Sequence, residues 1–190
     1  PDTNSAGYGL ANLLSDLERY DEAIPLRRRE LAWCRQTNGD TDLGTLTSIN
    51  GLAIDLREVG ELAEAETLFR ELVAGRQQVL EPGDFDIGRA LGGLAKTLEL
   101  AGKLEEARSY AQQALEHRLE HEGPDAWHTN LNRLGLARVL HQLGRSEQAL
   151  SLLQALQSSL TATANPDDND LDLLRQGEEL LAALNAADQP

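Results

Sequence analysis

The chain has 190 residues, enough for one or two domains, with 41% hydrophobic residues, only 4% aromatic residues and no methionine. Its formal net charge of -15, from 17 basic and 32 acidic residues, argues against sequence-independent nucleic-acid binding and against an anionic membrane surface. No apolar run approaches the ~18 residues of a membrane-spanning helix. Because the single Cys34 cannot form an internal disulfide, we expect a cytoplasmic protein.

A repeat of 42 residues organises the sequence from its first helix onward. The same residue types return at the same place in four copies, and such strict register predicts a solenoid of stacked structural repeats. The strongest columns are Gly9, Gly51, Gly93 and Gly135; Leu10, Leu52, Leu94 and Leu136; Ala11, Ala53, Ala95 and Ala137; and Ala23, Ala65, Ala107 and Ala149.

Each copy is predicted to form two helices. In the second copy the first helix carries Ile49, Leu52 and Leu56 at helical spacing. It stops at Gly60, because a residue without a Cβ can adopt the left-handed turn that ends a helix. The alanine columns fall where two helices must cross closely. The first copy has Glu18 in place of this glycine, so we expect some strain at its turn.

The predicted boundaries follow from the period. Between copies, segments rich in Gly, Pro and Asp break the second helix and supply N-caps for the next helix. We also predict that Asp21 caps the helix that contains Pro25, which would place this proline in the first turn. The predicted segments are four hairpins at about 1–40, 41–83, 84–124 and 125–164, followed by a capping helix and acidic tail at 165–190, about nine helices in all.

Several stretches carry a family resemblance. They are YDEAIPLRRRELA (20–32), SINGLA (48–53) and the end of GPDAWHTNLNRLGLA (123–137). With the 42-residue period, they resemble the long tetratricopeptide repeats of kinesin light chains and many bacterial signalling proteins, although the His-Pro dipeptide of that family is absent. The resemblance implies an all-α, right-handed superhelical solenoid of antiparallel helix pairs. It also implies a concave groove, lined by the first helices, that binds peptides or protein segments.

Candidate groove residues follow from helix geometry, because the inner stripe of each first helix lies opposite its Leu-Ala stripe. Basic and amide side chains recur there in a strongly acidic chain, which predicts a groove for an acidic peptide or a C-terminal carboxylate. The alternative is an ordinary solvated inner surface. The candidates are Tyr8, Asn12, Asn50, Arg57, Arg89, Lys96, Arg138 and His141.

Other polar clusters point to no chemistry. His117 and His121 have the spacing of two metal ligands on one helix face, but no third ligand is evident, so we interpret them as solvated residues. The basic run at 27–30 is interpreted as salt-bridge partners of Glu18, Asp21 and Glu22, with a docking patch as the alternative. Without a phosphate loop or a nucleophile elbow, we expect no enzyme, no cofactor and no metal site.

The predicted function is therefore a protein–protein interaction module that holds a peptide or partner segment in its concave groove. Because the chain begins at Pro1 and not at a methionine, we expect it to be the scaffold or sensor part of a larger protein. The alternative is a structural, oligomerising or autoinhibitory spacer whose groove and ends are filled by its own chain. That alternative predicts a homo-oligomer formed through the repeat ends.

Overall fold

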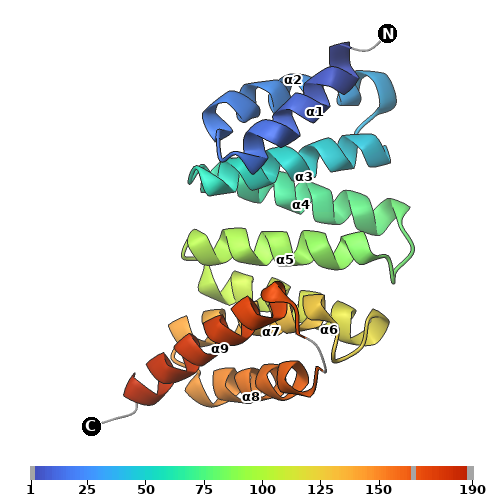
Figure 1. Cartoon of the computed structure of the whole chain (residues 1–190). Helices are drawn as coiled ribbons and strands as arrows, with labels where there is room; N and C mark the ends of the chain where they lie inside the picture. Colours follow the sequence, from blue (N-terminus) through green and yellow to red (C-terminus); the bar gives the residue numbers. More distant parts are fainter. Residues whose placement is uncertain (1–2, 164–165, 188–190) are drawn as a thin grey trace. The chain divides into compact units, whose positions relative to one another are not determined.

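The computed structural model describes residues 3–163 and 166–187, with the side chains of residues 3–8 and 187 left outside the description. This part of the chain forms nine α-helices and no strand (Figure 1). None of these helices is long and apolar enough to span a membrane. The helices are α1 (Thr3–Asp16), α2 (Tyr20–Asn38), α3 (Leu43–Glu58), α4 (Leu62–Val79), α5 (Phe85–Leu100), α6 (Leu104–His121), α7 (Trp127–Gln142), α8 (Ser146–Ala162) and α9 (Asp168–Ala187).

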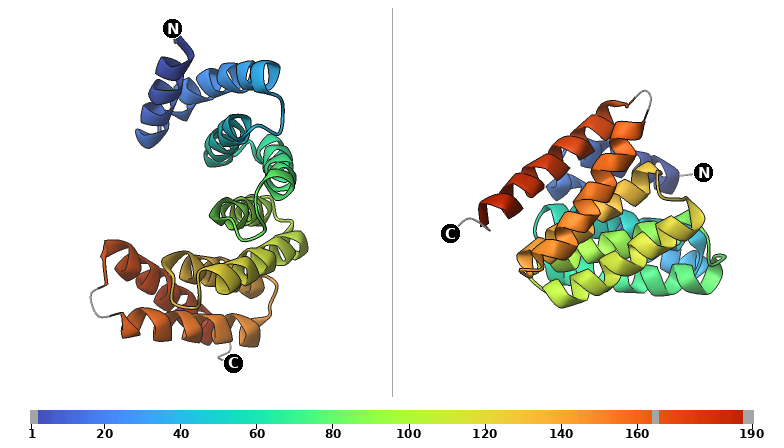
Figure 2. Two further views of the ribbon diagram at one scale, coloured as in Figure 1. Left: turned by 90° about the vertical axis from the view of Figure 1, so that its right-hand side faces the viewer. Right: turned by 90° about the horizontal axis from the view of Figure 1, so that it is seen from below.

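The chain divides into two compact units, residues 1–101 and 102–190. In the first unit, consecutive helices pack against one another from α1 to α5, and α3 also contacts α5. The first helices of the repeats, α1, α3 and α5, form one layer, and α2 and α4 form the other (Figure 2). In the second unit, α7 packs against α6 and α8, and α9 lies against α7 and α8.

The glycine turn between paired helices has the predicted conformation. Gly60 has a φ of 83°. Its amide donates to the carbonyl oxygen of Arg57 at 3.0 Å, and the next amide, of Glu61, donates to the carbonyl oxygen of Leu56 at 2.9 Å. These two bonds are a Schellman motif, which satisfies the last carbonyls of α3. Gly102 and Gly144 are also left-handed, so the prediction is confirmed at all three copies that have the glycine.

The first copy makes the same turn without glycine. Glu18 has a φ of 57° and is the only non-glycine residue with positive φ in the described part of the chain. The amides of Glu18 and Arg19 donate to the carbonyl oxygens of Ser15 (2.9 Å) and Leu14 (2.8 Å), as in the other copies. The left-handed region brings a Cβ close to a carbonyl oxygen, so the predicted strain is present at Glu18.

Glu18→Gly should therefore stabilise the first hairpin. We expect the free energy of unfolding to rise by about 0.5–1 kcal/mol, because relief of the steric strain outweighs the extra entropy of an unfolded glycine. Urea unfolding followed by circular dichroism measures the change. Glu18→Ala is the matched control, since alanine keeps the Cβ; an equal gain in Glu18→Ala would mean that charge, and not strain, is responsible.

The alanine columns are where the paired helices meet. Ala23, Ala65, Ala107 and Ala149 are each fully buried, as are Ala11, Ala53 and Ala137. Larger side chains at these positions would push the helix axes apart. The prediction that alanine allows each hairpin to close is confirmed by this burial.

Two helix starts differ from the prediction. Asp42 and Asp84 cap α3 and α5 as expected, but α7 begins after Ala126, with no side-chain cap. The prediction for Pro25 was wrong: α2 already starts at Tyr20 after Arg19, so Pro25 lies at the sixth helical position. The tight turn at Glu18 fixes this start, because the helix follows it directly, as α4 follows Gly60. Pro25 is exposed, and its ring points to solvent where its missing N–H costs least.

Candidate functional site

The first part of the candidate site is a stripe along α3. Asn50, Ile54 and Arg57 lie four and three residues apart, which places them on one face of the helix. All three are half-buried. Within the described chain, the side-chain amide of Asn50 makes no hydrogen bond, so its oxygen and its NH₂ group are both available to a ligand.

Arg57 is held on this stripe by two neighbours. Its guanidinium donates two hydrogen bonds to Oε1 of Glu58, at 3.1 Å from Nε and 2.8 Å from Nη2. It also lies over the ring of Phe69, 5.8 Å from the ring centroid, a cation–π arrangement. Only 15% of the side chain is exposed, so a ligand would meet the edge of the guanidinium.

The second part is on α5, where Arg89 and Lys96 lie seven residues apart on one face. Arg89 Nη2 is 2.8 Å from Asp86, and Lys96 Nζ is 3.7 Å from Glu99. Both cations are more exposed than Arg57, at 47% and 40% of their side chains. The predicted basic stripe is therefore charge-balanced within the first unit, because each of its cations has an acidic neighbour.

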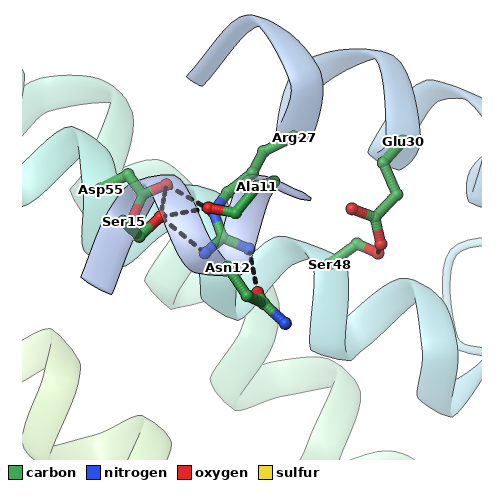
Figure 3. A network of polar contacts seen from close by, with 7 residues as sticks. All are labelled: Ala11, Asn12, Ser15, Arg27, Glu30, Ser48 and Asp55. Carbon is green, nitrogen blue, oxygen red and sulfur yellow. Dashed lines mark hydrogen bonds and ion pairs between the residues drawn. The ribbon is translucent and has the colours of Figure 1, made fainter. Parts of the chain in front are cut away.

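Asn12, the predicted site residue on α1, belongs to a buried polar network (Figure 3). Its Oδ1 accepts a hydrogen bond from Nη1 of Arg27 at 3.1 Å. Nε of Arg27 pairs with Oδ2 of Asp55 on α3, and Nη2 donates to the hydroxyl of Ser15 at 2.9 Å. Ser15 in turn donates to Oδ2 of Asp55 at 2.9 Å. The network ties α1, α2 and α3 together, so the oxygen of Asn12 serves the fold.

A smaller polar contact continues along the same interface. The hydroxyl of Ser48 donates to Oε1 of Glu30 at 2.8 Å and lies 3.5 Å from the sulfur of Cys34. All three residues are buried. The interface between α2 and α3 thus holds a second buried polar contact, and Cys34 is buried beside it.

The repeat period shows how unusual this interface is. Arg27 corresponds to Phe69 in the next copy, and Asp55 corresponds to Thr97. A Cβ added to Gly51 would collide with the Arg27 guanidinium, and one added to Gly93 would lie 2.5 Å from the Phe69 ring. In these two copies, the glycine of Gly-Leu-Ala therefore makes room for a large side chain from the preceding second helix, whereas a Cβ added to Gly135 would meet no atom within 4 Å. Sequence reasoning missed this role.

The basic run at 27–30 does not pair as predicted. Arg27 is buried against Asp55, and Arg28 pairs with Glu64 on α4 at 2.7 Å. The predicted partners, Glu18, Asp21 and Glu22, were wrong for these two arginines, because α3 and α4 offer carboxylates from the next copy. Arg35 and Glu71 show the same contact at 2.6 Å.

The remaining predicted residues lie elsewhere. Arg138 and His141 are half-buried on α7 in the second unit, so the structure assembles only the residues of α1, α3 and α5 into one layer. Tyr8 is in α1, but its side chain lies outside the described part.

The histidines of α6 and α7 contact one another and a nearby carboxylate. The rings of His117 and His121 are 4.8 Å apart, and Nδ1 of His128 is 3.3 Å from Glu122. Across the described residues, no group of three or more His, Cys, Asp or Glu side chains is placed to hold a metal ion. These contacts are accounted for by local packing at the end of α6.

Two buried arginines stabilise the links between hairpins. Arg76, at the end of α4, donates to the carbonyl oxygen of Asp86 at 2.9 Å, and burial lowers the pKa of its guanidinium. Arg133 on α7 donates to the carbonyl oxygen of Pro124 at 2.6 Å, and its pKa is also lowered by burial. Arg76 binds backbone in the first turn of α5 and Arg133 binds backbone in the loop before α7, so these shifts have a structural origin.

Comparison with known proteins agrees with this architecture. A search of curated protein sequences gave no match. Kinesin light chain TPR-like repeats from Podosopora anserina match at a TM-score of 0.80 and 19% identity, over 96% of this chain and 92% of the other. BtubC (BKLC) from P. vanneervenii matches at 0.73 and 14% identity, over 93% and 76%. Bacillus thuringiensis PlcR, in complex with the peptide PapR7 and DNA, matches at 0.65 and 17% identity, over 85% and 54%.

These likenesses confirm the predicted all-α solenoid of helix pairs. Family models described as tetratricopeptide repeat match residues 2–78, 50–120 and 133–155, which cover most of the sequence. The chain therefore belongs to the tetratricopeptide repeat family.

Proposed function

We propose that this chain is a protein-interaction module and that the inner face of α3 and α5 binds a segment of a partner protein. The observation that carries the proposal is the side-chain amide of Asn50, half-buried on the layer of first helices beside Ile54 and without a hydrogen bond to any residue that the structure describes. An amide can donate to and accept from one peptide group of a bound segment, whatever its sequence. PlcR, which has a related fold, was solved with a bound peptide, and this supports the proposal.

The cations around Asn50 suit an acidic segment. Exposed ion pairs such as Arg89–Asp86 are worth only about 0–1 kcal/mol, so a carboxylate of the partner can replace the internal one at little cost. The ion pair from Lys96 to Glu99, at 3.7 Å, is longer than the one from Arg89 to Asp86. Arg57, near the C-terminal end of α3, adds a third cation, and the ring of Phe69 holds its guanidinium in place.

Peptide-array binding tests this function with two variants of the chain. We expect the wild type to select acidic segments at roughly micromolar affinity, about -8 kcal/mol. Asn50→Ala should weaken binding about tenfold for every selected peptide, because the amide contacts backbone. The double variant Arg89→Glu, Lys96→Glu should abolish the preference for acidic residues.

Arg175→Glu is the matched control. Arg175 is an exposed arginine on α9 that pairs with Asp172 three residues away, the same arrangement as Arg89 and Asp86. We expect this variant to bind like the wild type. If the folded wild type selects no peptide, or if Arg175→Glu loses binding as much as the α5 variant, the inner face is not the binding site.

A further inference from the structure

The sequence contains two Asn-Gly dipeptides, and the fold places them in opposite surroundings. They are Asn38–Gly39 and Asn50–Gly51. Asn38 is the last residue of α2 and is exposed, whereas Asn50 lies in the middle of α3 and is half-buried. The contrast has a chemical consequence, because an asparagine followed by glycine reacts more readily with its own backbone than one followed by any residue with a side chain.

This reaction is a ring closure followed by hydrolysis. A base removes the proton from the backbone nitrogen of the glycine, and the nitrogen attacks Cγ of the asparagine. The N–Cγ bond forms, the Cγ–Nδ2 bond breaks, and Nδ2 takes a proton from water and leaves as ammonia. Water then opens the cyclic imide at one of its two carbonyl carbons. One opening gives aspartate, and the other gives isoaspartate, in which the backbone runs through the side-chain carbon.

We propose that Asn38 is a site of spontaneous deamidation in the folded chain and that α3 protects Asn50 from the same reaction. To close the ring, the glycine nitrogen must turn toward the asparagine side chain, and an α-helical backbone does not allow this. The glycine amide must therefore first leave its helical hydrogen bond. The free energy of that local opening decides which of the two dipeptides reacts.

Opening α2 at Asn38 disrupts little. The amide of Gly39 donates to the carbonyl oxygen of Arg35 at 3.1 Å, and this bond closes the last turn of the helix. Gly39 is exposed with a φ of 90°, and a Cβ added to it would meet no atom of the described chain within 4 Å, so the ring has room. The side chain of Asn38 already lies toward the linker, since its Nδ2 is 3.4 Å from Oδ1 of Asp42. Helix ends of this kind fray at almost no cost in free energy.

Opening α3 at Asn50 would disrupt the core of the first unit. Gly51 lies against the Arg27 guanidinium, with which an added Cβ would collide. The next two residues, Leu52 and Ala53, are 2% and 0% exposed. Freeing the Gly51 amide therefore separates packed side chains on both sides of α3, and its cost approaches that of unfolding the whole unit.

Deamidation of Asn38 changes the charge at the link between the first two hairpins. The new carboxylate would stand beside Asp42, whose Oδ1 caps α3 by accepting hydrogen bonds from two backbone amides. It would also lie at the C-terminal end of α2, where a negative charge is unfavourable. Arg35 is the basic residue of this last turn, and it is already paired with Asp40 and Glu71.

The isoaspartate product also changes the covalent path. It adds one carbon to the backbone at the last residue of α2, directly before the short linker of residues 39–42. Asp42 ends this linker and must keep its position to cap α3. Both products therefore weaken the attachment of the first hairpin to the second.

Peptide mapping by mass spectrometry tests the reaction. The full chain is kept folded at mildly alkaline pH, sampled over time and digested under acidic conditions that stop the reaction. We expect Asn38 to convert at least about tenfold faster than Asn50. In the chain unfolded in guanidinium, the two should convert at similar rates, because a β-branched residue, Thr37 or Ile49, precedes each of them. Equal rates in the folded chain, or conversion of Asn38 only after unfolding, would overturn the proposal.

The Asn38→Gln variant tests the consequence for the fold. Glutamine keeps the amide but must close a larger ring, so this variant should survive the same incubation unchanged. Urea unfolding followed by Trp33 fluorescence, in a Trp127→Phe background, should show a lower midpoint for the converted wild type and an unaltered midpoint for Asn38→Gln. Asn38→Asp should reproduce the part of the loss that is due to charge. An unaltered midpoint in fully converted wild type would show that the link tolerates the change, contrary to the proposal. None of these results involves a bound peptide, so this proposal and the inner-face proposal can fail separately.

Discussion

Asp55→Thr is expected to destabilise the first unit by about 3–5 kcal/mol, because it leaves the Arg27 guanidinium buried without its counter-ion. Asp55 is 1% exposed and Arg27 is 6% exposed, so water cannot replace the lost carboxylate without opening the interface between α1, α2 and α3. Asn12 and Ser15 accept hydrogen bonds from the guanidinium, but neither carries charge.

The next copy of the repeat supplies the compensating change. Phe69 and Thr97 occupy the positions of Arg27 and Asp55, so Arg27→Phe with Asp55→Thr replaces a buried ion pair by side chains that this fold already packs. Oδ1 of Asp55 has no hydrogen-bond partner among the described residues, and the double variant also removes this cost. We expect the double variant to lie within about 1 kcal/mol of the wild type or above it.

Trp33 fluorescence during urea unfolding measures both variants. Trp33 is the only tryptophan of residues 1–101, so a Trp127→Phe background makes the signal specific to the first unit. Arg28→Ala, which removes an exposed ion pair from the same helix, should cost less than about 1 kcal/mol. A double variant as unstable as Asp55→Thr alone would show that the ion pair contributes net stability, contrary to this account.

The period of 42 residues was sufficient to predict the order of the helices and the glycine turns between paired helices. Glycine at the turn and alanine at the helix crossings are local requirements, and a single sequence shows them when it repeats them four times. The strain at Glu18 could be predicted for the same reason, since one copy departed from a rule that the others obey. Gly177 lies 42 residues after Gly135, and a Cβ added to it would lie 3.1 Å from the side chain of Leu156. We did not predict this role, because the leucine and alanine that follow the glycine in the other copies are absent after Gly177.

Contacts between copies were harder to predict. Arg27 stands in a basic run that we interpreted as partners of Glu18, Asp21 and Glu22, and nothing in the sequence next to Asp55 marks it as buried. The signal was present in the columns, because Arg27 aligns with Phe69 and Leu153, and Asp55 aligns with Thr97 and Val139. A charged residue in each of two otherwise uncharged columns, on helices that pack together, predicts a buried pair. The partner at the inner face cannot be predicted in this way, because its sequence is not part of the repeat.

Phe69→Ala should have an effect of similar size, about 3–5 kcal/mol, because the ring is 1% exposed and fills the space above Gly93. The cavity would lie between α4 and α5, where no neighbouring side chain can move in without shifting a helix. Trp33 fluorescence in the Trp127→Phe background again measures the loss. Phe85→Ala is the matched control: its ring is 40% exposed, so its removal should cost less than about 1 kcal/mol.

The same ring also supports the inner face, since the Arg57 guanidinium lies over it. Phe69→Leu keeps most of the volume, so it should cost less than about 1.5 kcal/mol. It removes the aromatic face that holds Arg57 in place, so we expect a folded chain that binds acidic segments severalfold more weakly at the inner face. If Phe69→Leu binds as the wild type does, Arg57 takes no part in recognition, and the amide of Asn50 with the cations of α5 must account for it.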